Sequence, residues 1–152
     1  MADLIDLDEV AGCTCLRARR AARQLSRLYD GALEPAGLTV NQLGLLAKLL
    51  GATMRNPNGI AIGALAELVG MHPSTLNRDI NPLKKRGFVG DGRDPHDRRA
   101  RALFITKKGR DKLREAIPAW RCAQARVQEQ LGHEVMLSLN ALLDLACAKV
   151  AR

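Results

Sequence analysis

Only four of the 152 residues are aromatic, and this scarcity restricts the possible fold more than any other feature of the sequence. A core without aromatic rings must be built from Leu, Ala, Val and Ile, which supply most of the 47% hydrophobic content. β-Proteins depend on aromatic and β-branched side chains, whereas Leu and Ala favour helices. Since the length suits one domain and 26% of the residues are charged, we expect one compact, mainly helical chain.

The apolar spacing and the positions of Gly and Pro predict six helices and one hairpin. Apolar residues recur at helical spacing, and Gly or Pro residues end most of the helical segments. The helices are expected at about 10–34, 39–51, 62–70, 73–87, 106–132 and 135–150. Two short strands, at about 88–89 and 100–105, are expected to pair between the fourth and fifth helices. Thr39 and Thr106 are the expected N-caps of the second and fifth helices.

The fourth helix has two opposite faces. Leu76, Ile80 and Leu83 fall on one stripe, which is expected to face the core. The opposite stripe carries four side chains that can donate hydrogen bonds to phosphates or base edges: Ser74, Arg78, Asn81 and Lys85. A helix, a short turn containing glycine and a second helix with such an outer face are typical of a helix-turn-helix. Pro82 lies inside this helix and is expected to kink or tighten it.

The hairpin encloses a loop rich in arginine, Gly92–Arg99. A hairpin that directly follows a recognition helix is a wing, and arginine at its tip suits the narrow minor groove of DNA. Arg98 and Arg99 are therefore the candidate tip contacts, and Asp97 is expected either to orient Arg99 or to form a simple turn. The predicted fold class is mainly α with a small β-hairpin wing: a winged helix-turn-helix DNA-binding domain and a helical dimerisation region.

The positive charge is concentrated in the same segment. Residues 73–114 contain 13 basic and five acidic residues, a net charge of +8, which equals the formal net charge of the whole chain. A basic excess confined to one segment is expected for a protein that binds a phosphate backbone. A solvated basic surface is the alternative, and the helix and the wing favour DNA.

Four motifs in this region resemble MarR-family winged-helix regulators: Ser74-Thr75-Leu76-Asn77-Arg78, Lys85-Arg86-Gly87-Phe88-Val89, Asp97-Arg98-Arg99 and Ile105-Thr106-Lys107-Lys108-Gly109. The resemblance extends to length and helix order across nearly the whole chain. It implies a homodimer in which residues 1–34 and 107–152 form the helical dimerisation region and residues 35–106 bind DNA. It also implies a pseudo-palindromic operator, usually repression, and a small, often aromatic or anionic ligand between the dimer helices and the winged helix.

The candidate DNA-binding residues come from the helix and the wing together. Arginine pairs bidentately with guanine and asparagine with adenine, while serine and threonine contact either kind of base. The full set is Ser74, Thr75, Asn77, Arg78, Asn81, Lys85, Arg98, Arg99 and Arg101. For Arg78, an ion pair with a neighbouring acid is the alternative role.

Cys13 and Cys15 lie in the opening turns of the expected first helix. The helix dipole and a cation four residues after each cysteine, Arg17 and Arg19, favour a thiolate. The pair is a candidate redox sensor, loosely similar to the hydroperoxide-sensing branch of the MarR family, and the alternative is a buried structural role at the dimer interface. On a continuous helix the two sulfurs point about 200° apart, which disfavours a disulfide or a shared metal within one chain.

Other functions lack the residues that they need. The sequence has no glycine-rich phosphate loop, nucleophile elbow or acid pair, so we expect no enzyme activity and no cofactor. The three histidines are scattered, so no metal site is expected. No apolar run could span a bilayer and the start is acidic, unlike a secretory leader, so a cytoplasmic protein without membrane contact is expected. A protein-binding winged-helix adaptor remains the alternative, although it does not need +8 on one segment.

Overall fold

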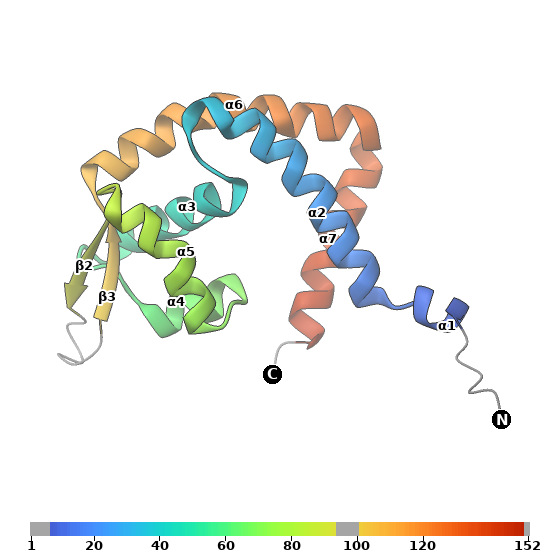
Figure 1. Ribbon diagram of the computed structural model, residues 1–152, viewed down its shortest axis with the longest axis horizontal. Helices are drawn as coiled ribbons and strands as arrows, with labels where there is room; N and C mark the ends of the chain where they lie inside the picture. The colour runs from blue at the N-terminus through green and yellow to red at the C-terminus, as the bar shows by residue number, and fades with distance from the viewer. Residues whose placement is uncertain (1–6, 94–100, 151–152) are drawn as a thin grey trace.

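The computed structural model of the protein describes residues 7–93 and 101–150. Its elements in chain order are α1 (Leu7–Ala11), α2 (Thr14–Leu33), the 3₁₀ helix η1 (Glu34–Ala36), α3 (Val40–Arg55), β1 (Ile60–Ala61), α4 (Ile62–Val69), α5 (Pro73–Lys85), β2 (Val89–Arg93), β3 (Arg101–Ile105), α6 (Lys107–Leu131) and α7 (His133–Val150). Figure 1 shows α3, α4, α5 and the sheet as one unit on the left, from which α2, α6 and α7 extend to the right. The predicted fold class is confirmed.

A small antiparallel sheet closes the unit formed by α3, α4 and α5, which we call the winged unit. β3 lies in the middle, with β1 and β2 on its two sides. The predicted hairpin is confirmed, with a register that runs from Val89 opposite Ile105 to Arg93 opposite Arg101. The sequence does not predict β1, because a strand of two residues is too short to show an alternating pattern.

The core of the winged unit is aliphatic, as the composition predicts. The predicted inner stripe of α5 is buried, with Leu76 and Leu83 at 0% and Ile80 at 1% exposure. Other fully buried side chains come from the elements around it: Leu33, Leu46, Leu49, Leu65, Leu103 and Ile105. Because Leu33 ends α2 and Leu113 belongs to α6, both long helices contribute to the same core.

Helix α3 is longer than the sequence predicts. It continues past Gly51 and ends at Arg55. A single glycine costs a helix only about 1 kcal/mol, and the burial of Ala52 in the next position offsets that cost. The helix ends where Pro57 disfavours the α conformation at Asn56, which is extended.

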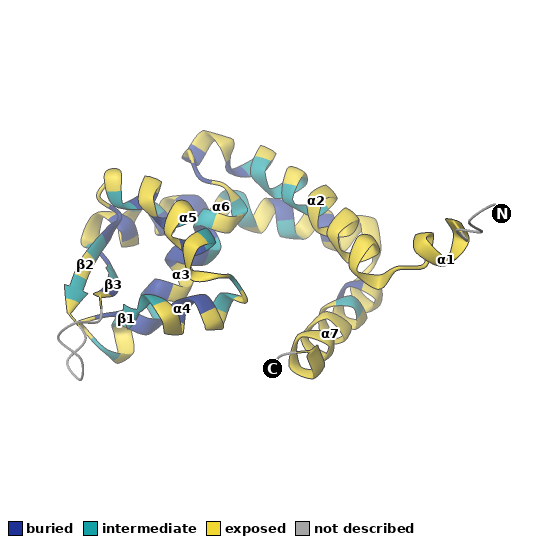
Figure 2. Ribbon diagram, turned by 60° about the horizontal axis from the view of Figure 1, so that its bottom comes forward, coloured by how far each residue is buried: buried dark blue, intermediate teal, exposed yellow. Residues whose placement is uncertain are grey.

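The long helices are largely exposed, as Figure 2 shows for α7 and the first half of α2. Met136 is the one buried residue of α7. The exposed large apolar residues of α6 and α7 are Leu131, Val135, Leu137, Leu142, Leu143, Leu145 and Val150. The Tyr29 hydroxyl donates to Gln124 at 2.5 Å, and Gln124 donates to the Met136 sulfur at 3.3 Å. Burial raises the pKa of Tyr29, so its hydroxyl stays a donor that joins α2 to α6.

Helices α6 and α7 meet at Gly132 and are bent by 105° relative to each other. Within residues 7–93 and 101–150, no single helix is both long and apolar enough to cross a membrane. The two helices reach that length and composition only as a bent pair.

Candidate nucleic-acid interface

Helix α5 presents a row of polar side chains to solvent. It begins with Pro73 in its first turn, after His72, whose side chain accepts a hydrogen bond from the Ser74 N–H. Gly87, with φ at 76°, follows its end. Among the predicted contacts, Thr75 is half-buried and the others on this helix are exposed: Ser74, Asn77, Arg78, Asn81 and Lys85. One helix therefore brings together most of the predicted DNA-binding residues.

Arg78 is available for an external partner. Its side chain has no ion pair or hydrogen bond with any other described residue, so the alternative of an internal ion pair finds no partner there. Pro82 does not end α5, which continues to Lys85. Proline lacks the N–H that would bond to the Arg78 carbonyl four residues earlier, yet Asn81 and Lys85 keep their exposed positions.

Lys84 and Arg101 both face Asp91 on β2. The Lys84 Nζ lies 2.6 Å from the Asp91 Oδ2, and the Arg101 Nη2 lies 3.5 Å from Oδ1. The Lys84 side chain is 23% exposed and the Arg101 side chain 70%. Lys84 therefore joins α5 to the first wing strand, whereas Arg101 leaves most of its guanidinium open to solvent. The sequence gives no signal for this pairing, because it depends on how the helix packs on the hairpin.

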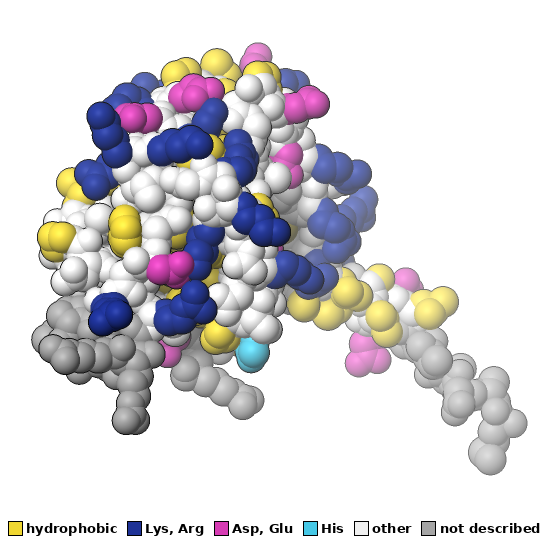
Figure 3. Space-filling model, turned by 60° about the vertical axis from the view of Figure 1, so that its left-hand side comes forward, with side chains coloured by type: hydrophobic (Ala, Val, Ile, Leu, Met, Phe, Trp, Pro, Cys, Tyr) yellow, Lys and Arg dark blue, Asp and Glu magenta, His cyan; other side chains and the backbone are white. Residues whose placement is uncertain are grey.

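The described strands form the base of the wing. Arg93 and Arg101 are opposite each other in the last residue pair of the hairpin, and both are exposed. The wing residues Asp97, Arg98 and Arg99 lie outside the described residues, so their roles stay predictions. Lys and Arg side chains cover much of the end of the molecule that carries the winged unit (Figure 3).

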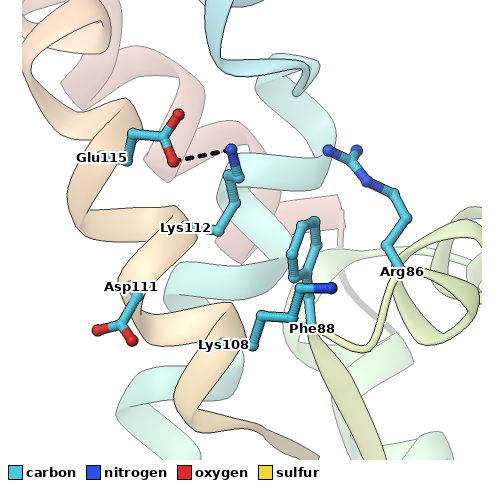
Figure 4. A pocket seen from close by; sticks show the side chains of 6 residues that line it. All are labelled: Arg86, Phe88, Lys108, Asp111, Lys112 and Glu115. Atoms are coloured by element: carbon cyan, nitrogen blue, oxygen red, sulfur yellow. Dashed lines mark ion pairs between the residues drawn. The ribbon is translucent and has the colours of Figure 1, made fainter.

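The C-terminal end of α5 is anchored to the long helices at a junction shown in Figure 4. The Arg86 Nη1 donates to the Gly37 carbonyl at 2.6 Å, and the guanidinium lies 4.6 Å from the centre of the Phe88 ring. From α6, Lys112 donates to the Ala36 carbonyl at 3.3 Å. Arg86, Phe88 and Lys112 line a cavity of about 490 Å³. Both cations already bond to backbone carbonyls of the η1 turn, so the junction fixes α5, η1 and α6 relative to one another.

A second cavity, which we call the α3–α6 groove, lies between the winged unit and the long helix α6. Its volume is about 470 Å³. The lining is mostly apolar with two arginines, and consists of Ala47, Leu50, Gly51, Met54, Arg110, Leu113, Arg114 and Ile117. Its position and its chemistry suit a small apolar or aromatic molecule that carries a negative charge.

The structure places Cys13 outside the helix that the sequence predicts. Helix α1 ends at Ala11, and Cys13 is the N-cap residue of α2, so the expected continuous helix is wrong at this point. The glycine before Cys13 is a poor helix former. Cys13 and Cys15 are both exposed, and Arg17 donates to the Ala11 carbonyl at 3.3 Å. Since Cys13 has ψ at 117°, the sulfur directions expected for a continuous helix do not apply.

This fold has counterparts among known transcriptional regulators. A sequence profile of the MarR family matches residues 36–100. The chain is 34% identical to the M. tuberculosis transcriptional regulator MosR in its crystal structure with DNA, over 91% of this chain and 98% of MosR, with a TM-score of 0.73. The chain belongs to the MarR family.

Two further relatives of this MarR-family chain act in opposite directions. BadR of Rhodopseudomonas palustris, a transcriptional activatory protein, is 31% identical over 102 residues, which cover 67% of this chain but only 57% of BadR. CouR, a transcriptional repressor bound to a 23-mer DNA duplex, is 26% identical over 97% of this chain and 99% of CouR, with a TM-score of 0.72. Another structure shows CouR from Rhodococcus jostii RHA1 bound to p-coumaroyl-CoA.

The sequence predicts no role for three residues that hold the ends of α5 in place. His72 caps α5, Asp91 forms an ion pair with Lys84, and Arg86 donates a hydrogen bond to the carbonyl of Gly37 after η1. The cap could have been predicted, because His72 directly precedes the expected start of the helix and lies two residues before Ser74. The contacts of Asp91 and Arg86 depend on tertiary packing, so the sequence does not predict them. In the described ranges, no group of three or more His, Cys, Asp or Glu side chains is placed to hold a metal ion.

Proposed function

We propose that this protein is a homodimeric, sequence-specific DNA-binding transcriptional regulator. Residues 35–106 would bind the operator, and residues 1–34 and 107–152 would form the dimer. The observation that carries this proposal is the exposed row of donors on α5, in which Arg78 has no partner within the described chain. A DNA-bound structure of the 34% identical MosR supports the same use of the fold.

Each residue of the interface has a role that follows from its chemistry. Arg78 reads a guanine, and Asn77 and Asn81 suit adenine. Ser74 and Thr75 contact bases or phosphates, and Lys85 neutralises a phosphate. Arg98, Arg99 and Arg101 belong to a wing that enters the minor groove, with Asp97 as the orienting carboxylate.

Arg78→Ala tests the base-reading role. We expect it to cost about 1–3 kcal/mol on the operator and to relax base preference at one position in each half-site. Lys107→Ala is the matched control, because Lys107 is exposed at the start of α6 and would contact only phosphate. It should weaken all sequences alike. Equal losses on operator and random DNA for Arg78→Ala would remove Arg78 from the base-reading set.

Regulation is proposed to be repression that a small ligand relieves. The α3–α6 groove lies where such a ligand would contact both the winged unit and α6. Arg110 could pair with an anionic group, and so could Arg114 in exchange for its exposed ion pair with Asp111. A ligand releases DNA only if it binds the DNA-incompetent arrangement of the two recognition helices more tightly. We therefore expect aromatic carboxylates to weaken operator binding by wild-type protein and to act much less on Arg114→Ala. Strengthened operator binding or activated transcription would favour a role like that of BadR.

Redox sensing through Cys13 and Cys15 is the second candidate, favoured by the exposure of both thiols beside a helix break. In such a reaction, the thiolate attacks a peroxide oxygen, is oxidised to a sulfenic acid, and the peroxide is reduced to water or an alcohol. The test is peroxide treatment of the operator complex with wild-type protein and a Cys13→Ser, Cys15→Ser variant. Release of the wild type alone would establish thiol sensing, whereas a wild type that stays bound would leave the ligand as the switch.

A further inference from the structure

His72 and Ser74 form a hydrogen-bonded pair at the exposed start of α5. The His72 Nδ1 lies 2.8 Å from the Ser74 Oγ and accepts a hydrogen bond from the Ser74 backbone N–H at 3.3 Å. Both side chains are exposed. The His72 carbonyl accepts the next two backbone donors of the helix, from Thr75 and Leu76, each at 3.0 Å. Because Pro73 has no N–H, His72 satisfies every backbone donor in the first turn.

The backbone contact favours one of the two neutral tautomers of His72. A backbone N–H can only donate, so the Nδ1 that receives it carries a lone pair and no hydrogen. In the tautomer with Nδ1 unprotonated, the Ser74 hydroxyl, 2.8 Å from the same nitrogen, donates its proton to Nδ1 and shares the lone pair with the backbone N–H. The ring proton is therefore on Nε2, which has no partner among the described residues.

We propose that His72 is a specificity-determining positioning residue that makes Ser74 a hydrogen-bond acceptor toward DNA. A free serine hydroxyl can donate or accept and so tolerates either kind of base. With its proton held by His72, the Ser74 oxygen presents only lone pairs. It therefore selects a major-groove amino group, on N4 of cytosine or N6 of adenine, over the acceptors of guanine and thymine. The outward Nε2–H of His72 remains to donate to a phosphate oxygen. This assignment rests on the proposed DNA-binding function.

Selection of bound sequences from a random duplex library tests this assignment with four variants. We expect the wild type to prefer cytosine or adenine at one position in each half-site, and His72→Ala to reduce that preference about fivefold, the value of one neutral hydrogen bond. Ser74→Ala should relax the same position, and the double variant should relax it no further. His72→Asn should restore the preference, since its amide oxygen can accept from both Ser74 donors.

The possible outcomes separate this assignment from the broader function. If His72→Ala weakens binding equally on all sequences and leaves the base preferences unchanged, His72 is only a helix cap and the assignment is overturned. If Ser74→Ala changes the base preference at no position, the assignment is overturned as well. Melting curves that match the wild type establish that each variant is folded. If His72→Ala does not fold, His72→Asn provides the test, and loss of the base preference in that folded variant overturns the assignment. A wild type that selects no sequence would overturn the proposed function and this assignment with it.

Discussion

Replacing Leu142 with glutamate is expected to dissociate the proposed dimer. Leu142 lies on α7, in the proposed dimerisation region, and is 63% exposed in the single chain. Complete burial of a leucine side chain contributes about 1.5–3 kcal/mol, so covering the exposed fraction contributes about 1–2 kcal/mol. A two-fold interface contains the residue twice, which gives about 2–4 kcal/mol for the dimer. The dissociation constant should therefore rise roughly 30- to 700-fold, and the cost of burying a carboxylate adds to this.

Sedimentation velocity over a range of concentrations measures this effect directly. Leu68→Glu is the matched control, because Leu68 is 47% exposed but lies on α4 of the winged unit, away from the long helices. We expect the control to remain a dimer at concentrations where Leu142→Glu is a folded monomer with weakened operator binding. A wild type that is monomeric at micromolar concentration would refute the reasoning, and so would equal dissociation by both variants.

Three other outcomes are expected from the junction, the wing and the charge. Arg86→Ala removes the bond to Gly37 and should lower the free energy of unfolding by about 1–3 kcal/mol in urea titrations; an unchanged value would contradict the anchoring role. Gly90→Ala places a Cβ 2.4 Å from the Phe104 ring, so it should cost about 1–3 kcal/mol and weaken operator binding, measured by melting and by fluorescence anisotropy. Operator affinity should fall about 10³-fold between about 50 and 200 mM salt if six phosphates are neutralised, whereas a flat response would favour the protein-binding adaptor.

The parts of the fold that the sequence predicts well are those with local causes. Thr39 and Thr106 cap α3 and α6 as expected, because an N-cap needs only a hydroxyl and a backbone N–H three residues later. The inner stripe of α5 is buried because helical spacing alone places Leu76, Ile80 and Leu83 on one side. The exposed outer row follows from the same geometry.

The parts that the sequence does not predict depend on contacts between distant segments. Asp91 forms an ion pair with Lys84 only because β2 packs beside the end of α5. The strand β1 exists because β3 offers it a free edge. At residue 12 a single glycine ends a helix, and at residue 51 it does not. The difference is that α3 is buried on one side at that point, whereas α1 buries none of its residues.

The two ends of α5 are held in different ways, and this decides which contacts respond to motion of the long helices. Its C-terminal end is tied to η1 and β2 through Arg86 and Lys84. Its N-terminal end is closed by its own cap, His72, at the exposed surface. Since the inner stripe of α5 is buried in the core, α5 moves together with the winged unit. The 13 residues of α5 extend about 20 Å, so a pivot of the winged unit by about 10° at the anchored end displaces the other end by roughly 3 Å. A shift of that size is as long as a hydrogen bond. The base contacts proposed for Ser74 and Arg78 would therefore be lost before the phosphate contact proposed for Lys85. We expect a small rotation to abolish sequence recognition while weak, non-specific DNA binding remains.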